Sequence, residues 1–166
     1  MDNSTKIGHM ILSMREYQKQ NNISGHCVTN TQYLYDLIKH NFKKTNVKAK
    51  AFFVLSYDEN TGISIIVSGH LAIVLDDTDI IEPSYNIFCR KNTYYFDNIK
   101  DLMNSMNEIN NKHTFKSKEN IRKLIFDYIE FNKIATSINN GELCVSDKLY
   151  YNQQADYIKS VFKYII

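Results

Sequence analysis

The 166-residue sequence contains one proline and five glycines, and it contains no stretch that would serve as a Pro/Gly/Ser-rich linker between domains. Its length suits one hydrophobic core and is short for two. We therefore expect residues 1–166 to form a single domain. With so few glycines there is little room for a Gly-rich phosphate loop, and we expect no cofactor.

Cysteine is also scarce. The three cysteines, Cys27, Cys89 and Cys144, are widely spaced and form no C-x-x-C pair, which excludes a standard zinc knuckle and a disulfide framework. No run approaches the roughly 20 apolar residues that cross a bilayer, and the N-terminus lacks the apolar segment of a signal peptide. We expect reduced thiols, no membrane span and a cytoplasmic protein, with no metal site.

The sequence also lacks a large net charge, because its 20 basic and 18 acidic residues leave only +2. The densest basic stretch, residues 116–123, includes Glu119 and precedes Asp127, so it is typical of a solvated helix face. Nucleic acid is therefore not an expected partner. The charged fraction of 23% and the apolar fraction of 43% are ordinary for a globular protein.

The sequence begins and ends with helical patterns. Apolar residues recur at helical spacing over residues 7–19, and the polar segment 20–25 interrupts them. A second amphipathic helix should start near Cys27, because Gly25 permits a sharp turn just before it. Further helices are expected around 99–106, over 117–138 and over 153–165.

Between these helices lie short runs of β-branched and aromatic residues, separated by segments with turn chemistry. The runs cover residues 51–55, 63–67, 70–75 and 80–81, and residues 94–96 add a further strand. We expect a central antiparallel meander of about four to five strands. Helices, then a sheet, then helices define the α+β class.

Cys27 is the candidate nucleophile. The segment Ser24-Gly25-His26-Cys27 places it in the first turn of the second helix. At such a position, unpaired N–H groups and the helix dipole favour an ionised thiol, and a neighbouring imidazolium favours it further. Cysteine acyl chemistry also requires a base and a group that orients the base.

His70 is the candidate base and Glu82 the group that orients it. We expect His70 at the start of a strand, and a hairpin through residues 76–79 should return the chain past it to Glu82. A two-residue turn would put Glu82 opposite Ile73, on the wrong face. A three-residue loop or a bulge would put it opposite Ala72, on the face of His70. The hypothesis therefore predicts the longer loop.

This order of residues resembles that of the papain-like cysteine enzymes, including the transglutaminase-like, arylamine N-acetyltransferase and NlpC/P60 groups. Glu82-Pro83-Ser84 resembles the Asp-Pro-Ser/Thr that follows the histidine strand in transglutaminase-like members, with Glu in place of Asp. The resemblance covers about residues 20–90 and leaves a helical remainder, residues 97–166. It implies a papain-like fold. The motifs directly around the cysteine in these groups are not present at Cys27.

The resemblance also implies a hydrolase or acyltransferase that acts on an amide, isopeptide or thioester bond through an acyl-enzyme. Substrates would be a protein, a peptide or an acylated small molecule. In papain-like proteases a glutamine several residues before the cysteine helps to form the oxyanion hole, and Gln20 and Asn21 are the candidates here. The backbone N–H of Cys27 would be the second donor.

Two alternatives remain open on the sequence alone. The chain could be a catalytically inactive papain-like binding module, or an inhibitor of a partner protein, because the motifs around Cys27 depart from those of the known groups. A zinc site formed by Cys27, His70 and Glu82 is the other alternative, since thiolate, imidazole and carboxylate all bind zinc.

Overall fold

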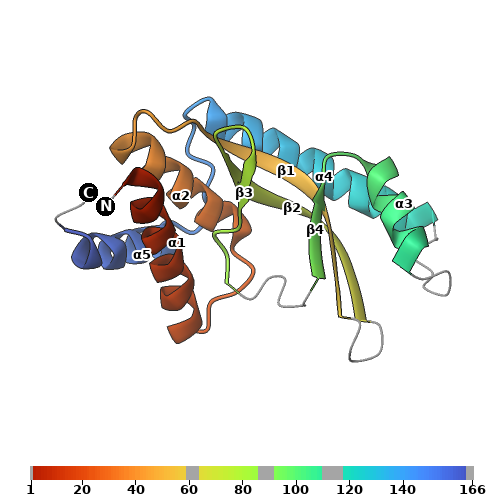
Figure 1. Cartoon of the computed structure of the whole chain (residues 1–166), viewed down its shortest axis with the longest axis horizontal. Coiled ribbons are helices and arrows are strands. Elements are labelled where there is room, and N and C mark those ends of the chain that lie inside the picture. Colours follow the sequence, from red (N-terminus) through yellow and green to blue (C-terminus); the bar gives the residue numbers. More distant parts are fainter. Residues whose placement is uncertain (1, 59–63, 86–91, 110–117, 164–166) are drawn as a thin grey trace.

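The computed structural model of the chain describes residues 2–58, 64–85, 92–109 and 118–163. In this part the fold is α+β, with five helices and a four-stranded antiparallel sheet (Figure 1). The expected class, with helices on either side of a sheet segment in the sequence, is confirmed. In chain order the elements are α1 (Asn3–Gln20), α2 (Cys27–Asn41), β1 (Val47–Asp58), β2 (Ser64–Leu75), β3 (Asp79–Ile81), β4 (Asn92–Phe96), α3 (Ile99–Ile109), α4 (Lys118–Asn139) and α5 (Lys148–Val161).

The sheet is built on a long hairpin of β1 and β2, each 12 residues, paired from Val47 with Leu75 to Asp58 with Ser64. The sequence predicted two separate strands, over 63–67 and 70–75, and this expectation is wrong. Ser68 and Gly69 continue the strand, because Gly69 is a place of close packing against α4 and not a turn.

The other two strands occupy opposite edges, in the order β3-β2-β1-β4. The first three strands form the expected meander, but β4 crosses to the far side and pairs with residues 53–57 of β1. Pro83 follows β3 closely, and a proline has no N–H with which to continue a ladder. The chain therefore leaves that edge after three paired residues, and β4 adds to the free edge of β1.

Alternation along β1 divides the core between the two faces of the sheet. On one face, Phe53 and Leu55 pack with Leu102 of α3 and Leu124 of α4. The same face, nearer the start of β1, contributes to a larger cluster with α1, α2, α4 and α5. On the opposite face, Phe52, Val54 and Ala72 form a smaller cluster with Tyr95 of β4. This smaller cluster lies beside His70, which faces the same side.

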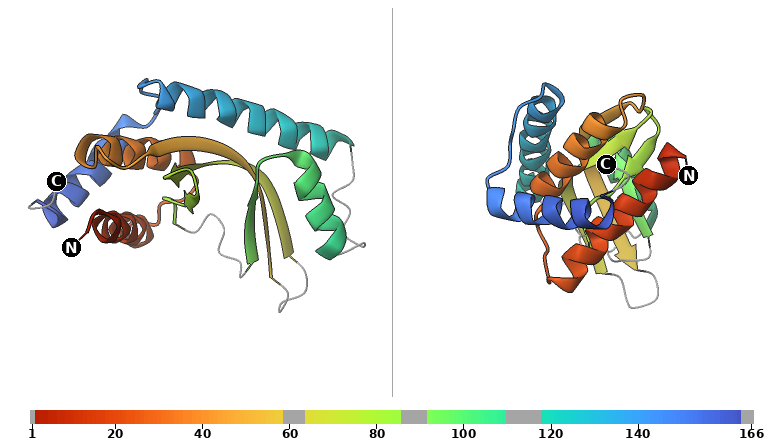
Figure 2. Two further views of the ribbon diagram at one scale, coloured as in Figure 1. Left: turned by 45° about the horizontal axis from the view of Figure 1, so that its top comes forward. Right: turned by 90° about the vertical axis from the view of Figure 1, so that its left-hand side faces the viewer.

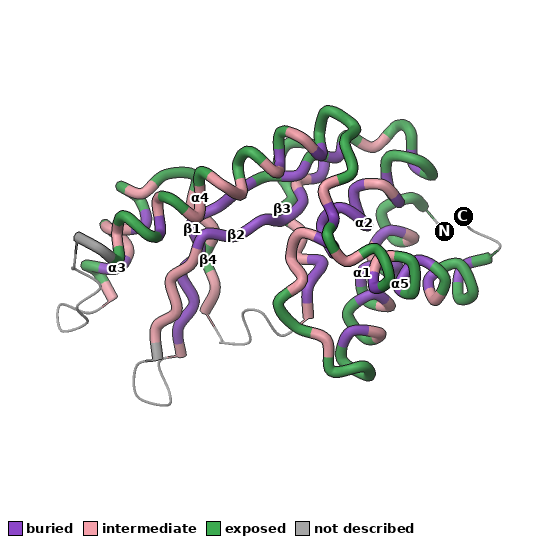
Figure 3. Tube along the Cα trace, turned by 180° about the vertical axis from the view of Figure 1, so that it is seen from behind, coloured by how far each residue is buried: buried purple, intermediate pink, exposed green. Residues whose placement is uncertain are grey.

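The helices are arranged along the curved hairpin (Figure 2). Helix α4 lies along β1 and β2, whereas α1, α2 and α5 gather at one end and α3 lies at the other (Figures 1 and 2). Much of the hairpin beside α4 is buried, and the outer turns of the helices are exposed (Figure 3). The N-terminus of α2 is thereby brought against the middle of β2.

Two helices begin earlier than the apolar pattern predicted, because side chains cap them. Asp2 accepts a hydrogen bond from the backbone N–H of Thr5 at 2.7 Å and starts α1 at Asn3. Asp147 accepts one from the N–H of Tyr150 at 3.0 Å and starts α5 at Lys148. Each cap satisfies an N–H that the first turn of a helix leaves unpaired.

Candidate active site

Cys27 is the first residue of α2, as the sequence predicted. Gly25 has a φ of 77°, a left-handed conformation that suits glycine, and it turns the chain into the helix. His26 at the N-cap makes no side-chain capping hydrogen bond. The thiol is half-buried and packs against the large cluster, at the end of a helix where the first N–H groups have no partner within the helix.

His70 lies in the middle of β2, opposite Phe52 of β1, with only 3% of its surface exposed. The expectation that it opens a strand is therefore wrong. The strand passes through Gly69 without a break because α4 crosses there: a Cβ on Gly69 would lie 3.0 Å from the backbone nitrogen of Tyr128. The strand that carries the imidazole is therefore paired with β1 along one edge and packed against α4 at Gly69.

Glu82 reaches the same face through the longer loop that the hypothesis required. Thr78 donates its N–H to the carbonyl of Leu75, and the two residues between them, Asp76 and Asp77, have φ values of 51° and 63°. The ladder then pairs Leu75 with Asp79, so Thr78 is an additional residue in the loop. This register sets position 82 opposite Ala72, and the predicted three-residue loop is confirmed.

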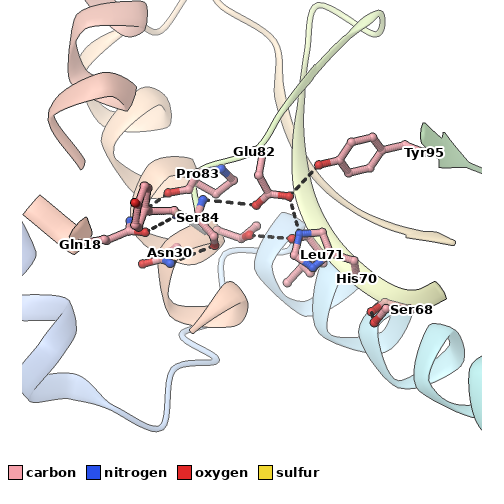
Figure 4. A network of polar contacts seen from close by, with 12 residues as sticks. Gln18, Asn30, Ser68, His70, Leu71, Glu82, Pro83, Ser84 and Tyr95 are labelled. Carbon is pink, nitrogen blue, oxygen red and sulfur yellow. Dashed lines mark hydrogen bonds and ion pairs between the residues drawn. The ribbon is translucent and has the colours of Figure 1, made fainter. Parts of the chain in front are cut away.

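The carboxylate of Glu82 is held by three groups (Figure 4). Its Oε1 lies 2.5 Å from Nε2 of His70 and accepts a hydrogen bond from the Tyr95 hydroxyl at 2.8 Å. Its Oε2 accepts the backbone N–H of Ser84 at 3.2 Å. With contacts to both of its oxygens, the carboxylate is fixed in direction.

His70 is placed between this carboxylate and the thiol. Burial alone would lower the pKa of His70, but hydrogen bonds to Cys27 and Glu82, together with the negative charge of both, raise it to about 9. Because Nε2 faces Glu82, Nδ1 is the ring nitrogen left for Cys27. The structure thus brings the three predicted residues together, in surroundings that favour the protonated form of the imidazole.

A buried polar network ties the helix of Cys27 to the segment of Glu82. Asn30, one turn along α2 from Cys27, donates to the hydroxyl of Ser84 at 2.9 Å (Figure 4). Its Oδ1 accepts from the hydroxyl of Tyr150 at 2.5 Å. Gln18 of α1 donates to the carbonyl of Pro83 at 2.9 Å and accepts the N–H of Tyr85 at 2.6 Å. These satisfied contacts specify one arrangement of the segment.

Sequence reasoning missed Gln18, Asn30 and Tyr95. A signal existed for Gln18: it follows Met14 by four residues on the apolar stripe of α1, so its amide is directed inward and is almost fully buried. A similar signal existed for Asn30, which lies one turn after Cys27 in α2 and is buried. No such signal existed for Tyr95, because its contact with Glu82 depends on the non-local pairing of β4 with β1.

The two residues predicted to supply the oxyanion hole are not brought into this group. Gln20 donates to Glu16 at 3.2 Å, and Asn21 donates to the carbonyl of Tyr17 at 2.8 Å. Both side chains are exposed and bonded within or next to α1. The donor that the structure does provide beside Cys27 is the uncapped first turn of α2.

A cavity of about 450 Å³ lies beside Cys27 and His70. Its other walls come from Gly25 before α2, from β2 and from α4. In the described part of the chain, β3 pairs only with the last three residues of β2, and the cavity lies along the part of β2 before them. Among the described residues, β3 therefore does not cover the part of β2 that lines the cavity beside the thiol.

The remaining cysteines lie elsewhere. Cys144 is half-buried, and burial together with Glu142 raises the pKa of its thiol. Cys89 falls outside the described residues. Among the residues that the structure describes, no group of three or more His, Cys, Asp or Glu is arranged to hold a metal ion.

In the described segments, no helix combines the length and apolar character needed to cross a membrane. Comparison of the chain with protein-family models, with curated proteins and with solved structures gives no match in any of the three.

Proposed function

We propose that the chain is a cysteine-dependent hydrolase or acyltransferase in which Cys27 is the nucleophile, His70 the general acid and base, and Glu82 the group that orients the imidazole. The observation that carries the proposal is the position of His70, which hydrogen-bonds to Cys27 on one side and to Glu82 on the other. The proposal includes a papain-like relationship, because the nucleophile at a helix start and the base on a neighbouring strand are the arrangement of those enzymes.

In the first half of the reaction, the Cys27 thiolate attacks the acyl carbon of an amide, isopeptide or thioester and forms a carbon–sulfur bond. The negative charge moves to the carbonyl oxygen, where the N–H groups of the first turn of α2 stabilise it. The bond to the leaving group then breaks, and the His70 imidazolium donates its proton to that group.

In the second half, neutral His70 removes a proton from water or from an amine, which attacks the thioester carbon. The carbon–sulfur bond breaks and restores the thiolate beside the imidazolium. Hydrolysis and transfer differ only in which nucleophile enters. Throughout, Glu82 and its donors Tyr95 and Ser84 keep Nε2 of His70 engaged, so that Nδ1 faces the sulfur.

An activated ester tests the proposal without knowledge of the substrate. With p-nitrophenyl acetate we expect a burst of about one equivalent of p-nitrophenol and an acetyl group on Cys27 in the mass spectrum. Cys27→Ala should abolish the burst, whereas Cys144→Ala should retain it, because Cys144 does not line the cavity. Acetylation of Cys27 no faster than that of Cys144 would overturn the proposal and favour a binding module.

A further inference from the structure

The cavity beside Cys27 and His70 has one acidic side chain in its described wall, Asp127 of α4. The other lining residues outside the pair are the apolar Ile66 and Phe131, the hydroxyl-bearing Ser68 and the glycines Gly25 and Gly69. A molecule that reaches the thiol therefore meets an apolar surface and one carboxylate.

The position of Asp127 relative to the catalytic pair is fixed by close backbone packing. A Cβ built on Gly69 would lie 3.2 Å from the Cβ of Asp127, and Gly69 is the residue directly before His70. Helix α4 and strand β2 thus touch at Gly69, the residue before His70, while the His70 side chain faces the other side of the sheet. The carboxylate of Asp127 and the imidazole of His70 therefore line one cavity from neighbouring elements.

The carboxylate is accessible to a ligand. Lys123 pairs with it at 2.8 Å, but the Lys123 side chain is 76% exposed and the Asp127 side chain 34% exposed. An exposed pair four residues apart on a helix contributes little free energy, and its lysine can turn into solvent. A cation bound in the cavity would replace Lys123 at small cost.

We propose that this cavity selects substrates that carry a positively charged group, an ammonium or a guanidinium, close to the reacting carbonyl, and that Asp127 is the residue that determines this specificity. The inference rests on the proposed function, since it concerns the occupant of the cavity next to the nucleophile. The charges of the site favour one orientation: the carbonyl oxygen faces the N-terminus of α2, and the cation faces α4.

Three thiol reagents that differ in charge test the inference: 2-aminoethyl, methyl and 2-sulfonatoethyl methanethiosulfonate, which are cationic, neutral and anionic. In each case the Cys27 thiolate attacks the sulfenyl sulfur, forms a disulfide and releases methanesulfinate. The chain would carry Cys89→Ser and Cys144→Ser, so that Cys27 is the single thiol. The measured quantity is the ratio of the cationic to the anionic rate constant.

In this background, we expect Asp127→Asn to lower the ratio about tenfold and to leave the rate of the neutral reagent within about twofold. Lys123→Gln should raise the ratio, because it removes the competing cation. Glu130→Gln is the matched control: it removes one negative charge from the same helix, but Glu130 does not line the cavity.

A ratio that Asp127→Asn leaves unchanged, or changes no more than Glu130→Gln does, would overturn the inference. The neutral reagent separates this failure from that of the proposed function. If the neutral reagent modifies Cys27 rapidly but Asp127→Asn does not change the ratio, only the proposed specificity is wrong. If it modifies Cys27 no faster than Cys144 in a chain that keeps Cys144 alone, the nucleophile itself is wrong and both proposals fall.

Discussion

The hydroxyl of Tyr95 donates a hydrogen bond to Oε1 of Glu82 at 2.8 Å, and the same oxygen lies 2.5 Å from Nε2 of His70. Tyr95 belongs to β4, at the far edge of the sheet from the strand that leads to Glu82. Its ring packs edge-on against Phe52, the residue opposite His70. The phenol therefore acts as a positioning group that fixes the carboxylate from the side opposite α2.

Tyr95→Phe tests this role. Without the hydroxyl, Glu82 is held less firmly against His70, so we expect kcat for ester hydrolysis to fall about tenfold with little change in KM. The pKa of His70, followed by NMR, should change, because the Tyr95 hydroxyl and the imidazole share Oε1 of Glu82. Tyr94→Phe, at an exposed neighbouring position, is the control. A loss of stability with no change in kcat or in the His70 titration would show that Tyr95 is only structural.

The raised pKa of His70 also makes stability depend on pH. A group whose pKa is higher in the folded state stabilises the fold below its unfolded pKa, and that contribution is lost as the pH rises through the folded value. With values of 6.5 and about 9, the contribution is complete below about pH 6.5 and is lost toward pH 9 and above. Its magnitude is of the order of 3 kcal/mol at most.

Urea unfolding of the wild type and of His70→Gln between pH 6 and 10 measures this contribution. The difference in unfolding free energy between the two proteins should shrink as the pH rises through this range. A difference that stays constant from pH 6 to 10 would mean that His70 carries no additional proton in the folded state.

The close approach of α4 to β2 gives a second stability prediction. Gly69→Ala places a Cβ 3.0 Å from the Tyr128 nitrogen, and backbone atoms cannot move aside as a flexible side chain can. We expect a loss of about 1–3 kcal/mol in unfolding free energy.

Gly8→Ala is the matched control for that substitution. Gly8 lies within α1 and has nothing within 4 Å of the position that a Cβ would take. Alanine at this helical site should raise stability by up to about 1 kcal/mol. Equal effects of the two substitutions would contradict the assigned packing at Gly69.

Sequence reasoning predicted those parts of the site that depend on neighbouring residues. The start of α2 at Cys27 follows from a glycine and an amphipathic stripe, and the loop before β3 follows from the requirement that Glu82 and His70 share a face. The α+β class follows from the order of helical and strand patterns. These features depend on residues that are near in sequence.

The features that sequence reasoning missed depend on contacts between distant segments. The pairing of β4 with β1 joins residues about 40 positions apart and brings Tyr95 to Glu82. The place of His70 in mid-strand was missed because Ser68-Gly69 has the composition of a turn, and only the passage of α4 explains a glycine there. Gln20 and Asn21 are near Cys27 along the chain, but their side chains are exposed, whereas Gln18 is the amide that α1 directs inward.

The most direct test of the account is the rate at which iodoacetamide alkylates Cys27 near pH 7 in a chain that carries Cys89→Ser and Cys144→Ser. If the proton of the thiol resides on His70, Cys27 should react at least about tenfold faster than Cys144 in a chain that keeps Cys144 alone, and His70→Gln should abolish the difference. Equal rates for the two cysteines, or a Cys27 rate that His70→Gln does not change, would contradict the proposal that His70 activates this thiol.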